Sequence, residues 1–342
     1  MEGSKKIRVA INGFGRIGRV FFKLVCENSE IEIVAINDLA DKDNLLYLLK
    51  YDTPYQKCSP ECAEKIKKVQ FLGEPDPHNL PWKDLEVDVV VEATGVFNTY
   101  EKANAHIEAG AKKVVLTAPV KNEKNTSAET PDYGVSGKTV LMGINEDELK
   151  NCQISANGSC TTNAVSPVLQ ILNQQIGVEK AILNTIHSYT STQRLVDSPS
   201  KKDYRKGRAA AQNIIPTSTG AAIATTLAIK ELEGKFDGMA MRVPTVLGSI
   251  VDLTFISKKD TTKEEINSIL KKASQDENWQ NVFSVTDEPV VSSDIIGNPY
   301  ASIADLSLTK VIGGNLVKVL IWYDNEMGYA RTLVKHVLKT SE

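Results

Sequence analysis

The chain has 342 residues, of which 42% are hydrophobic and 24% charged, and its formal net charge is −3 at pH 7. This length exceeds what one compact core usually holds and favours two domains. The lack of a basic excess argues against nucleic acid or an anionic membrane as the main partner, so small molecules are the expected ligands.

The cysteine content indicates a reducing compartment. The five cysteines are Cys26, Cys58, Cys62, Cys152 and Cys160. An odd number in a long chain argues against a disulfide framework and predicts reduced thiols in the cytoplasm. The first apolar run is interrupted by Arg8 and Asn12, too early for the core of a signal peptide. No membrane span and no metal site are expected.

In the first half of the chain, short β-rich runs alternate with helical patterns. Strands are expected at 7–11, 31–36, 87–91, 114–117 and 140–144, and helices at 16–27 and 100–108. Such alternation predicts an α/β fold, a doubly wound Rossmann-type parallel sheet.

In the second half the strands are longer and helices are fewer. Strands are expected at 181–190, 238–257 and 316–323, which indicates a second, α+β domain with a largely antiparallel sheet. The boundary is expected near Cys160, giving domains of residues 1–160 and 161–324. A closing helix near 326–338 carries an apolar stripe. Residues 325–342 are therefore expected to complete the first domain.

A glycine-rich motif, G-F-G-R-I-G at residues 13–18, follows the first strand and opens a helix. Gly13 permits a tight turn, Gly15 lets the backbone approach a pyrophosphate, and Gly18 allows close helix–strand packing. Asp38 ends the second strand, where a carboxylate bonds ribose hydroxyls and repels a 2′-phosphate, which selects NAD over NADP. The context favours a dinucleotide site over a purely structural turn.

Cys160 lies just before an apolar stretch, residues 165–176, that is expected to form a buried helix. The partial positive charge of a helix N-terminus stabilises a thiolate, which is the nucleophilic form of cysteine. The position therefore predicts a thiol that is primed to ionise and that acts in covalent catalysis.

A base for this thiol must come from one of four histidines: His78, His106, His187 and His336. His187 ends a predicted strand, where catalytic groups commonly project, whereas the others lie in a turn or in helical patterns. It is the candidate partner of Cys160, and a packing or surface role is the alternative.

Several groups suited to phosphate accompany these two residues. They are Ser159 and Thr161 beside the thiol, Thr190 after the histidine, Thr219 and Gly220 at a predicted helix start, and Arg242 in a strand. Hydroxyls, helix N-termini and arginine all bind anions, so two anion sites near one thiol are predicted. Ordinary alternatives are a helix cap at Thr219 and a surface ion pair at Arg242.

Two segments are more ambiguous. Thr117 follows a predicted strand and can offer a hydroxyl to the adenine or nicotinamide side of a dinucleotide, although a plain strand-end turn has the same pattern. Residues 189–214 lack periodicity and carry many charges. Loops of this length are usually functional or interfacial, which favours an anion or subunit contact over a solvated surface.

Six ordered blocks together closely resemble the phosphorylating glyceraldehyde-3-phosphate dehydrogenases. They are NGFGRIGR at 12–19, AIND at 35–38, SCTTN at 159–163, RAAAQNIIP at 208–216, MRVPT at 241–245 and WYDNE at 322–326. The resemblance implies oxidation of glyceraldehyde 3-phosphate by NAD, with inorganic phosphate as acyl acceptor and 1,3-bisphosphoglycerate as product. It also implies a homotetramer in which the loop after Tyr189 packs near a neighbour's cofactor.

The resemblance further assigns roles to individual residues. Cys160 matches the nucleophile and His187 its base. The positions that hold NAD, with the glycine motif, are Arg16, Ile17, Asp38, Thr117 and Asn325. Those around the substrate's 3-phosphate are Thr190 and Arg242, and those around inorganic phosphate are Ser159, Thr161, Arg208, Thr219 and Gly220.

The chain departs from the family pattern at several positions. Gly158 replaces the usual alanine before the Ser-Cys pair, which loosens the turn. Ala164 replaces a second cysteine, which removes a route to local disulfide inactivation. Pro75 occupies the place of an arginine that contacts the adenosine part of the cofactor, which puts cofactor affinity in question.

Two other functions are compatible with the sequence. An erythrose-4-phosphate dehydrogenase on the same scaffold would use water instead of phosphate as acyl acceptor. A catalytically feeble binding protein would keep the dinucleotide fold and use another surface, although the presence of Cys160 and His187 argues against it.

Overall fold

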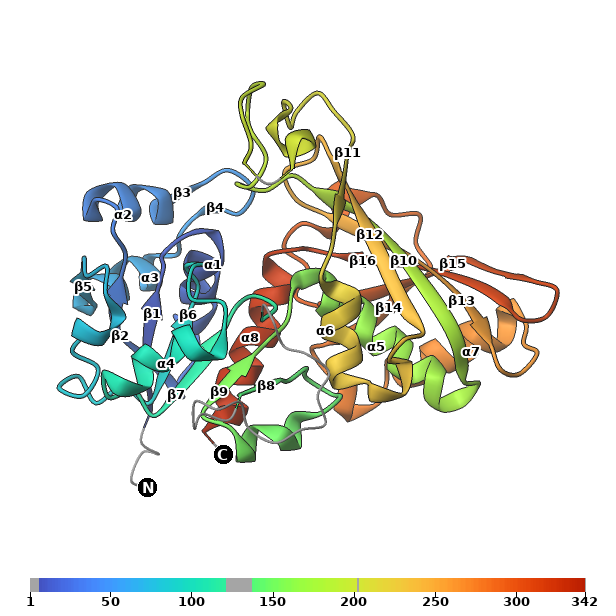
Figure 1. The fold of residues 1–342 in the computed structure, drawn as a ribbon, viewed down its shortest axis with the longest axis horizontal. Helices are drawn as coiled ribbons and strands as arrows, with labels where there is room; N and C mark the ends of the chain where they lie inside the picture. Colours follow the sequence, from blue (N-terminus) through green and yellow to red (C-terminus); the bar gives the residue numbers. More distant parts are fainter. Residues whose placement is uncertain (1–5, 121–136, 202, 342) are drawn as a thin grey trace. The chain divides into compact units, whose positions relative to one another are not determined.

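The computed structural model describes residues 6–120, 137–201 and 203–341. The chain divides into two compact units, Met1–Gly158 with Ala330–Glu342, and Ser159–Tyr329. Each unit is built on a seven-stranded sheet (Figure 1). None of the helices in the described ranges combines the length and apolar character that a bilayer crossing needs.

The first unit contains a parallel sheet with the strand order β5-β2-β1-β6-β7-β9-β8. Its strands are β1 (Ile7–Asn12), β2 (Ile31–Asn37), β5 (Gln70–Leu72), β6 (Val89–Glu92), β7 (Lys113–Leu116), β8 (Gly137–Thr139) and β9 (Ile154–Ala156). The helices are α1 (Arg16–Val25), α2 (Lys42–Lys50), α3 (Pro60–Lys65) and α4 (Tyr100–Glu108), with a hairpin of β3 (Tyr51–Asp52) and β4 (Gln56–Lys57). Strand β6 is buried throughout, as expected for a parallel sheet covered on both faces.

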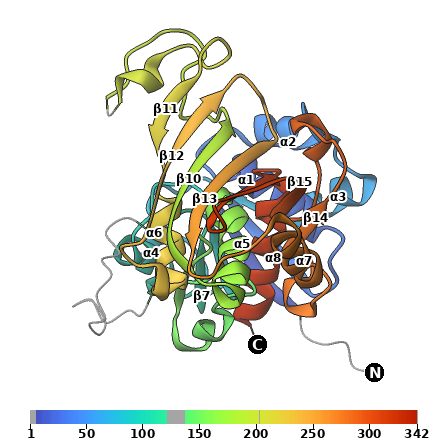
Figure 2. The same cartoon turned by 90° about the vertical axis from the view of Figure 1, so that its right-hand side faces the viewer.

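The second unit contains a mixed sheet with the order β11-β12-β10-β13-β16-β15-β14. Its strands are β10 (Val178–Ser188), β11 (Ile215–Ser218), β12 (Phe236–Val243), β13 (Ser249–Ser257), β14 (Phe283–Thr286), β15 (Ser302–Ile312) and β16 (Leu316–Tyr323). The pairs β10–β12 and β14–β15 are parallel and the other pairs antiparallel, and β10, β12 and β13 run side by side (Figure 2). The predicted fold class is therefore confirmed.

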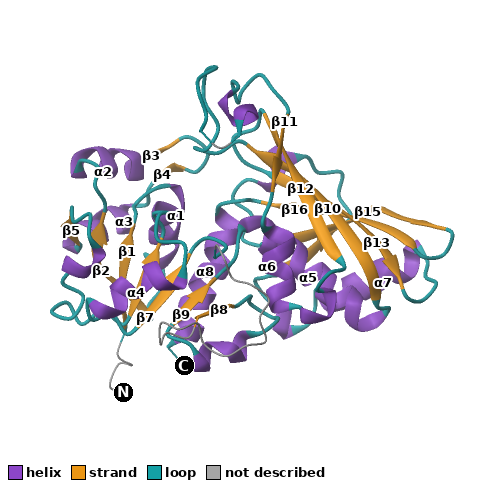
Figure 3. Cartoon of the chain, in the orientation of Figure 1, coloured by secondary structure: helices purple, strands orange, loops and turns teal. Residues whose placement is uncertain are grey.

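Three helices, α5 (Cys160–Gln175), α6 (Ala221–Ala228) and α7 (Lys263–Ala273), belong to the second unit, and α8 (Met327–Thr340) closes the chain. Buried and partly exposed residues alternate along β13, because one face of this sheet is packed and the other is not. The segment between β10 and β11 is mainly loop, with one helical turn at Tyr204–Gly207 (Figure 3).

The strand expected at 140–144 is wrong, because this buried apolar run folds as a turn. The Asn145 side chain accepts from the Leu141 N–H (2.8 Å) and donates to the Thr139 carbonyl (3.0 Å). Gly143 adopts φ 80°, a conformation that suits glycine and interrupts a strand. Side-chain bonds to the backbone thus replace a sheet ladder.

The single strand expected at 238–257 is also wrong, since the structure divides it into β12 and β13. Pro244 lacks an N–H for a ladder, and Gly248 has φ 83°. A Cβ on Gly248 would lie 2.1 Å from the Ser292 carbonyl oxygen, so the chain can turn there only with glycine. The β12 strand can then pair in parallel with β10 while β13 pairs antiparallel on its other side.

His336 in α8 is a fully buried polar anchor of the first unit. Its Nε2 lies 2.7 Å from Ser155 Oγ, and its Nδ1 lies 3.1 Å from Asn157 Oδ1. The amide oxygen can only accept, so Nδ1 carries the proton and Nε2 accepts from the serine hydroxyl. Burial lowers the pKa of His336 from 6.5 to about 3.

This buried histidine predicts a loss of stability in acid. Because the folded pKa of His336 lies below its unfolded value, its contribution is complete above pH 6.5 and decreases as the pH falls toward about 3. The expected slope is roughly 1.4 kcal/mol of unfolding free energy per pH unit for one proton. The unfolding free energy, measured by urea unfolding at several pH values between 7 and 5, should change less steeply with pH in His336→Gln than in the native protein.

His78→Gln is the matched control. Hydrogen bonding to Asp76 raises the pKa of His78, so this exposed histidine acts in the opposite direction and its loss should not reduce the slope. Equal slopes for native protein and His336→Gln would contradict the assignment.

Candidate active site

The turn between β1 and α1 shows what two of its glycines do. Gly13 has φ 95°, and a Cβ there would lie 2.7 Å from the Thr94 backbone nitrogen. A Cβ on Gly18 would lie 2.3 Å from the Gly13 carbonyl oxygen. At Gly15, in contrast, an added Cβ would meet no described atom within 4 Å. The first and third glycines therefore serve the fold, while the second leaves open space beside the helix start.

A cavity of about 350 Å³ lies beside this turn, within the size range of small-molecule sites. Gly13, Gly15 and Asp38 line it, together with Pro75. The Asp38 carboxylate accepts from the backbone N–H groups of Phe14 (2.7 Å) and Ala40 (2.9 Å). A helix start that no described side chain caps, open backbone and an acidic group fit the pyrophosphate and ribose of a dinucleotide.

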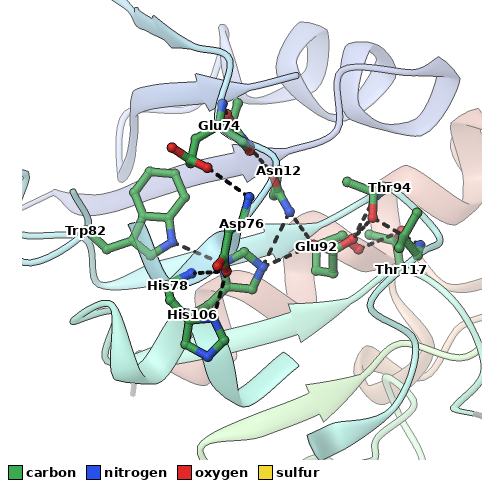
Figure 4. Close-up of polar contacts among 11 residues, drawn as sticks. Asn12, Glu74, Asp76, His78, Trp82, Glu92, Thr94, His106 and Thr117 are labelled. Atoms are coloured by element: carbon green, nitrogen blue, oxygen red, sulfur yellow. Dashed lines mark hydrogen bonds and ion pairs between the residues drawn. The ribbon is translucent and has the colours of Figure 1, made fainter. Parts of the chain in front are cut away.

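A buried carboxylate supports one wall of the cavity. Glu92 Oε2 accepts from Asn12 Nδ2 (2.6 Å), and Oε1 accepts from the Thr94 N–H (2.8 Å) and the Thr94 hydroxyl (Figure 4). Trp82 Nε1 donates to His106 Nδ1 at 3.0 Å, and indole N–H is only a donor. The other ring nitrogen, Nε2, therefore carries a proton and donates to Glu92 Oε2 at 3.1 Å. Four donors thus satisfy the carboxylate and hold the turn at Thr94.

The thiol of the second unit stands at the first residue of α5. Ser159 is the N-cap, and its hydroxyl accepts from the Thr162 N–H (3.1 Å) while its own N–H donates to Thr162 Oγ1 (3.2 Å). This reciprocal capping box fixes where the helix begins. It therefore fixes the position of Cys160 Sγ relative to the sheet of its unit.

Cys160, His187 and Arg242 lie together in this unit. Cys160 Sγ is 3.3 Å from His187 Nε2, and Arg242 Nη1 is 2.6 Å from His187 Nδ1. The parallel register of β10 and β12 places His187 opposite Arg242. Arg242 Nε is buried and has no hydrogen-bond partner among the described residues, which leaves a donor for an anion.

The electrostatics of the pair differ from the sequence expectation. Burial raises the pKa of the Cys160 thiol, and the charge of Arg242 and hydrogen bonds from Thr161 offset this only in part. Burial and the charge of Arg242 lower the pKa of His187 to about 3. Desolvation therefore opposes the ionisation that is expected of a thiol at a helix start, and it favours the neutral form of both groups.

Comparisons with known proteins show which family the chain resembles. Residues 7–100 match the NAD binding domain of glyceraldehyde 3-phosphate dehydrogenase, and residues 159–325 match its C-terminal domain. The chain is 49% identical over 337 residues to the glyceraldehyde-3-phosphate dehydrogenase of Thermotoga maritima, covering 96% of this chain and 97% of that protein.

The chain belongs to the glyceraldehyde-3-phosphate dehydrogenase family. Two further relatives with the same name are each 44% identical to it, from Streptomyces coelicolor over 338 residues and Geobacillus stearothermophilus over 337 residues. In both cases the alignment covers 96% of each chain.

Some of the predicted cofactor residues of this dehydrogenase lie away from the cavity wall. Arg16 forms an ion pair with Asp52 (3.0 Å), and the Thr117 hydroxyl donates to the Glu92 carbonyl (3.0 Å). Ile17 is partly exposed in the first turn of α1. Asn325 belongs to the second unit, where its Oδ1 accepts from the hydroxyls of Ser188 (2.8 Å) and Ser249 (3.1 Å).

The predicted phosphate residues of the dehydrogenase have partners within the second unit. Thr161 Oγ1 lies 3.0 Å from the Tyr323 hydroxyl, and Thr190 Oγ1 lies 2.9 Å from Thr192 Oγ1. Arg208 forms an exposed ion pair with Asp197 (3.0 Å). Thr219 Oγ1 accepts from the Ala221 N–H (3.2 Å), and Gly220 is the N-cap of α6.

Sequence reasoning missed Tyr323 and the Glu92–His106 pair. The Tyr323 hydroxyl lies 2.7 Å from Thr185 Oγ1 and 3.0 Å from Thr161 Oγ1, and its ring stands edge-on to His187 with centroids 5.9 Å apart. The Tyr323 hydroxyl thereby links the N-terminus of α5, through Thr161, to strand β10, which carries His187. The signal for Glu92 was an acid ending a buried apolar strand at the carboxyl edge of a parallel sheet.

The glycine turn generates a prediction with a matched pair of variants. Gly18→Ala should lower the unfolding free energy by about 1–3 kcal/mol, because its Cβ collides with the Gly13 carbonyl. Gly15→Ala should change it by less than about 1 kcal/mol but weaken NAD binding roughly tenfold or more, since the methyl occupies the open space. Chemical unfolding and NAD titration measure the two effects. Native NAD affinity in Gly15→Ala would contradict a cofactor at this turn.

Arg242 generates a second prediction, on pH dependence. Arg242→Leu removes a positive charge, so the pKa of Cys160 should rise further and that of His187 should rise from about 3. The rate of alkylation by neutral iodoacetamide at pH 8 should fall several-fold, with its pH profile displaced to higher pH. Arg205→Leu, which removes an exposed arginine paired with Asp203, is the control. An unshifted profile in Arg242→Leu would refute the electrostatic coupling.

Proposed function

We propose that the chain catalyses the NAD-dependent oxidative phosphorylation of D-glyceraldehyde 3-phosphate to 1,3-bisphosphoglycerate, with Cys160 as nucleophile and His187 as base. Family membership supports the reaction. The 3.3 Å contact between Cys160 Sγ and His187 Nε2 is the single observation that carries these two roles. A neutral imidazole at this distance can take the thiol proton directly.

The base role requires one tautomer of His187. For Nε2 to accept a proton, Nδ1 must carry one and donate it to the Ser188 carbonyl, 2.6 Å away. Arg242 Nη1 lies 3.0 Å from the same carbonyl and also 2.6 Å from Nδ1. An N–H of Arg242 that donated to Nδ1 would enforce the wrong tautomer. We infer that an anion binding Arg242 favours the base-competent form.

The chemistry then follows from the two side chains. His187 takes the proton of the Cys160 thiol, and the thiolate adds to the aldehyde carbon. The protonated imidazole returns this proton to the oxygen and completes the hemithioacetal, and neutral His187 then accepts the hydroxyl proton as hydride leaves the carbon. When bound, NAD supplies the acceptor for the hydride that leaves this carbon. Cys160 then holds the acyl group as a thioester. Attack by inorganic phosphate releases the acyl phosphate and restores the thiol.

The remaining site residues take supporting roles in this proposal. NAD is held by Gly13, Gly15, Arg16, Ile17, Gly18, Asp38, Thr117 and Asn325. The 3-phosphate of the substrate contacts Thr190 and Arg242, and inorganic phosphate contacts Ser159, Thr161, Arg208, Thr219 and Gly220. The unpartnered Nε of Arg242 supports an anion there.

Domain roles and assembly are also part of the proposal. Residues 1–160, completed by the helix within 325–342, bind NAD, and residues 161–324 carry the catalytic groups. The protein acts as a cytoplasmic homotetramer, with the loop after Tyr189 close to a neighbouring subunit. The length of this loop supports an interfacial role.

The proposal predicts phosphate-dependent reduction of NAD by the native chain. Absorbance of reduced nicotinamide should rise with glyceraldehyde 3-phosphate only when inorganic phosphate is present. Cys160→Ser should lose at least about a thousandfold in kcat because the covalent step fails, and His187→Asn about 10²–10⁴-fold because the proton transfer fails.

Cys152→Ala is the matched control, since this buried thiol contacts the Leu149 carbonyl (4.0 Å) and takes no part in the proposed chemistry. Its kcat should be native. Turnover of erythrose 4-phosphate without phosphate would assign the other dehydrogenase activity. Inertness toward both aldehydes would overturn the enzymatic proposal.

A further inference from the structure

Three of the five cysteines gather in the first unit, at positions with no role in the proposed reaction. Cys26 is the C-cap of α1, and Cys58 and Cys62 flank the N-cap of α3. Cys26 Sγ and Cys62 Sγ are 2.7 Å apart. This is closer than the roughly 3.5–4.0 Å at which even two carbon atoms make optimal contact. The two sulfurs are therefore held in close contact although both cysteines are free thiols.

Other contacts hold α3 against α1 and fix this approach. Lys65 Nζ donates to the Cys26 carbonyl, which joins the end of α3 to the end of α1. Asp52, on the segment that leads to α3, pairs with Lys23 (3.3 Å) and Arg16 (3.0 Å) of α1. The short distance between the sulfurs thus rests on several bonds between the same two segments.

The three thiols differ in accessibility. Cys26 and Cys62 are 2% and 1% exposed, whereas Cys58 is partly exposed. Cys58 lies four positions before Cys62, directly ahead of the Ser59 N-cap of α3. Cys62 therefore contacts a buried sulfur and follows a partly exposed thiol by four positions in the same segment, and thiol–disulfide exchange requires such a reachable thiol.

We propose that Cys26 and Cys62 form a reversible disulfide under oxidation, and that Cys58 is the thiol through which an external reductant opens it. With hydrogen peroxide as oxidant, each thiol loses one hydrogen, one S–S bond forms, and peroxide is reduced to two water molecules. The buried pair is preorganised for this step because the sulfurs have to close only from 2.7 Å to the roughly 2.05 Å of an S–S bond.

Opening of the disulfide proceeds by exchange. The Cys58 thiolate attacks the Cys62 sulfur, the Cys26–Cys62 bond breaks, and Cys26 leaves as a thiolate that takes up a proton. The resulting Cys58–Cys62 disulfide includes the one accessible sulfur. An external dithiol then reduces it in two exchange steps, supplying two electrons and becoming a disulfide itself.

The thiols exchange slowly because they ionise with difficulty. Burial, with a smaller effect from the Cys62 thiol, raises the pKa of Cys58 to about 12, and the hydrogen bond with Cys26 together with burial raises the pKa of Cys62 further. The charge of Lys23 opposes both shifts. Formation and opening are therefore expected over minutes to hours.

Peptide mapping tests the proposal on the full chain. Cys160→Ser, which removes the catalytic thiol as a competing target, is treated with hydrogen peroxide, alkylated, digested and analysed by mass spectrometry. A peptide linked through Cys26 and Cys62 is expected, and the cross-link, which spans 36 positions, should raise the Tm by about 5 °C or more. Dithiothreitol should reverse both changes.

Further substitutions in this Cys160→Ser background separate the roles. Cys26→Ala and Cys62→Ala should abolish the increase in Tm, and Cys152→Ala should keep it. Cys58→Ala should still form the disulfide but be reduced by dithiothreitol at least tenfold more slowly. The absence of a Cys26–Cys62 peptide in the natively folded chain overturns the disulfide, and native reduction kinetics in Cys58→Ala overturn the exchange role. Neither readout depends on the dehydrogenase reaction.

Discussion

The part-buried contact between Cys160 and His187 is the constraint around which the second unit is arranged. Desolvation of the partly exposed thiol and of the buried imidazole favours the neutral form of each, so their reactivity depends on the position of one proton between Sγ and Nε2. The capping box of α5 sets the sulfur, and the β10–β12 register sets the imidazole and Arg242. Tyr323 joins both through Thr161 and Thr185. Each contact therefore contributes to a proton transfer geometry.

In the first unit, a buried carboxylate holds the turn that lines the cavity. Glu92 stands at the carboxyl end of β6, and its oxygens are bonded by Asn12, Thr94 and His106. A carboxylate in this position is tolerated because its donors replace water. The same hydrogen bonds shape the turn that lines the cavity. The donors that satisfy the buried carboxylate therefore also set the geometry of the ligand site.

The sequence predicted the alternation of strands and helices in the first unit, and the glycine turn with its acidic partner, because these depend on local patterns. The strand predicted at residues 140–144 was wrong, because hydrogen bonds of the Asn145 side chain hold these apolar residues in a turn. The single strand predicted at 238–257 was also wrong, because the chain turns at Gly248 and forms two strands. In both cases the apolar pattern predicted correctly that the residues are buried, but it could not predict the hydrogen-bond partners of their backbone groups. The position of Cys160 at a helix start was likewise apparent, but its desolvation was not.

The sequence by itself determined the fold class, the family, and the candidate nucleophile and base, because residue type, spacing and ordered motifs are properties of the linear chain. Only the tertiary structure decided that Arg242 faces His187, that Tyr323 supports the thiol helix, and that Cys26 meets Cys62. These pairs are separated by 36 to 162 positions. Protonation and reactivity depend on distance and desolvation, and both are set by packing between segments that local sequence does not relate.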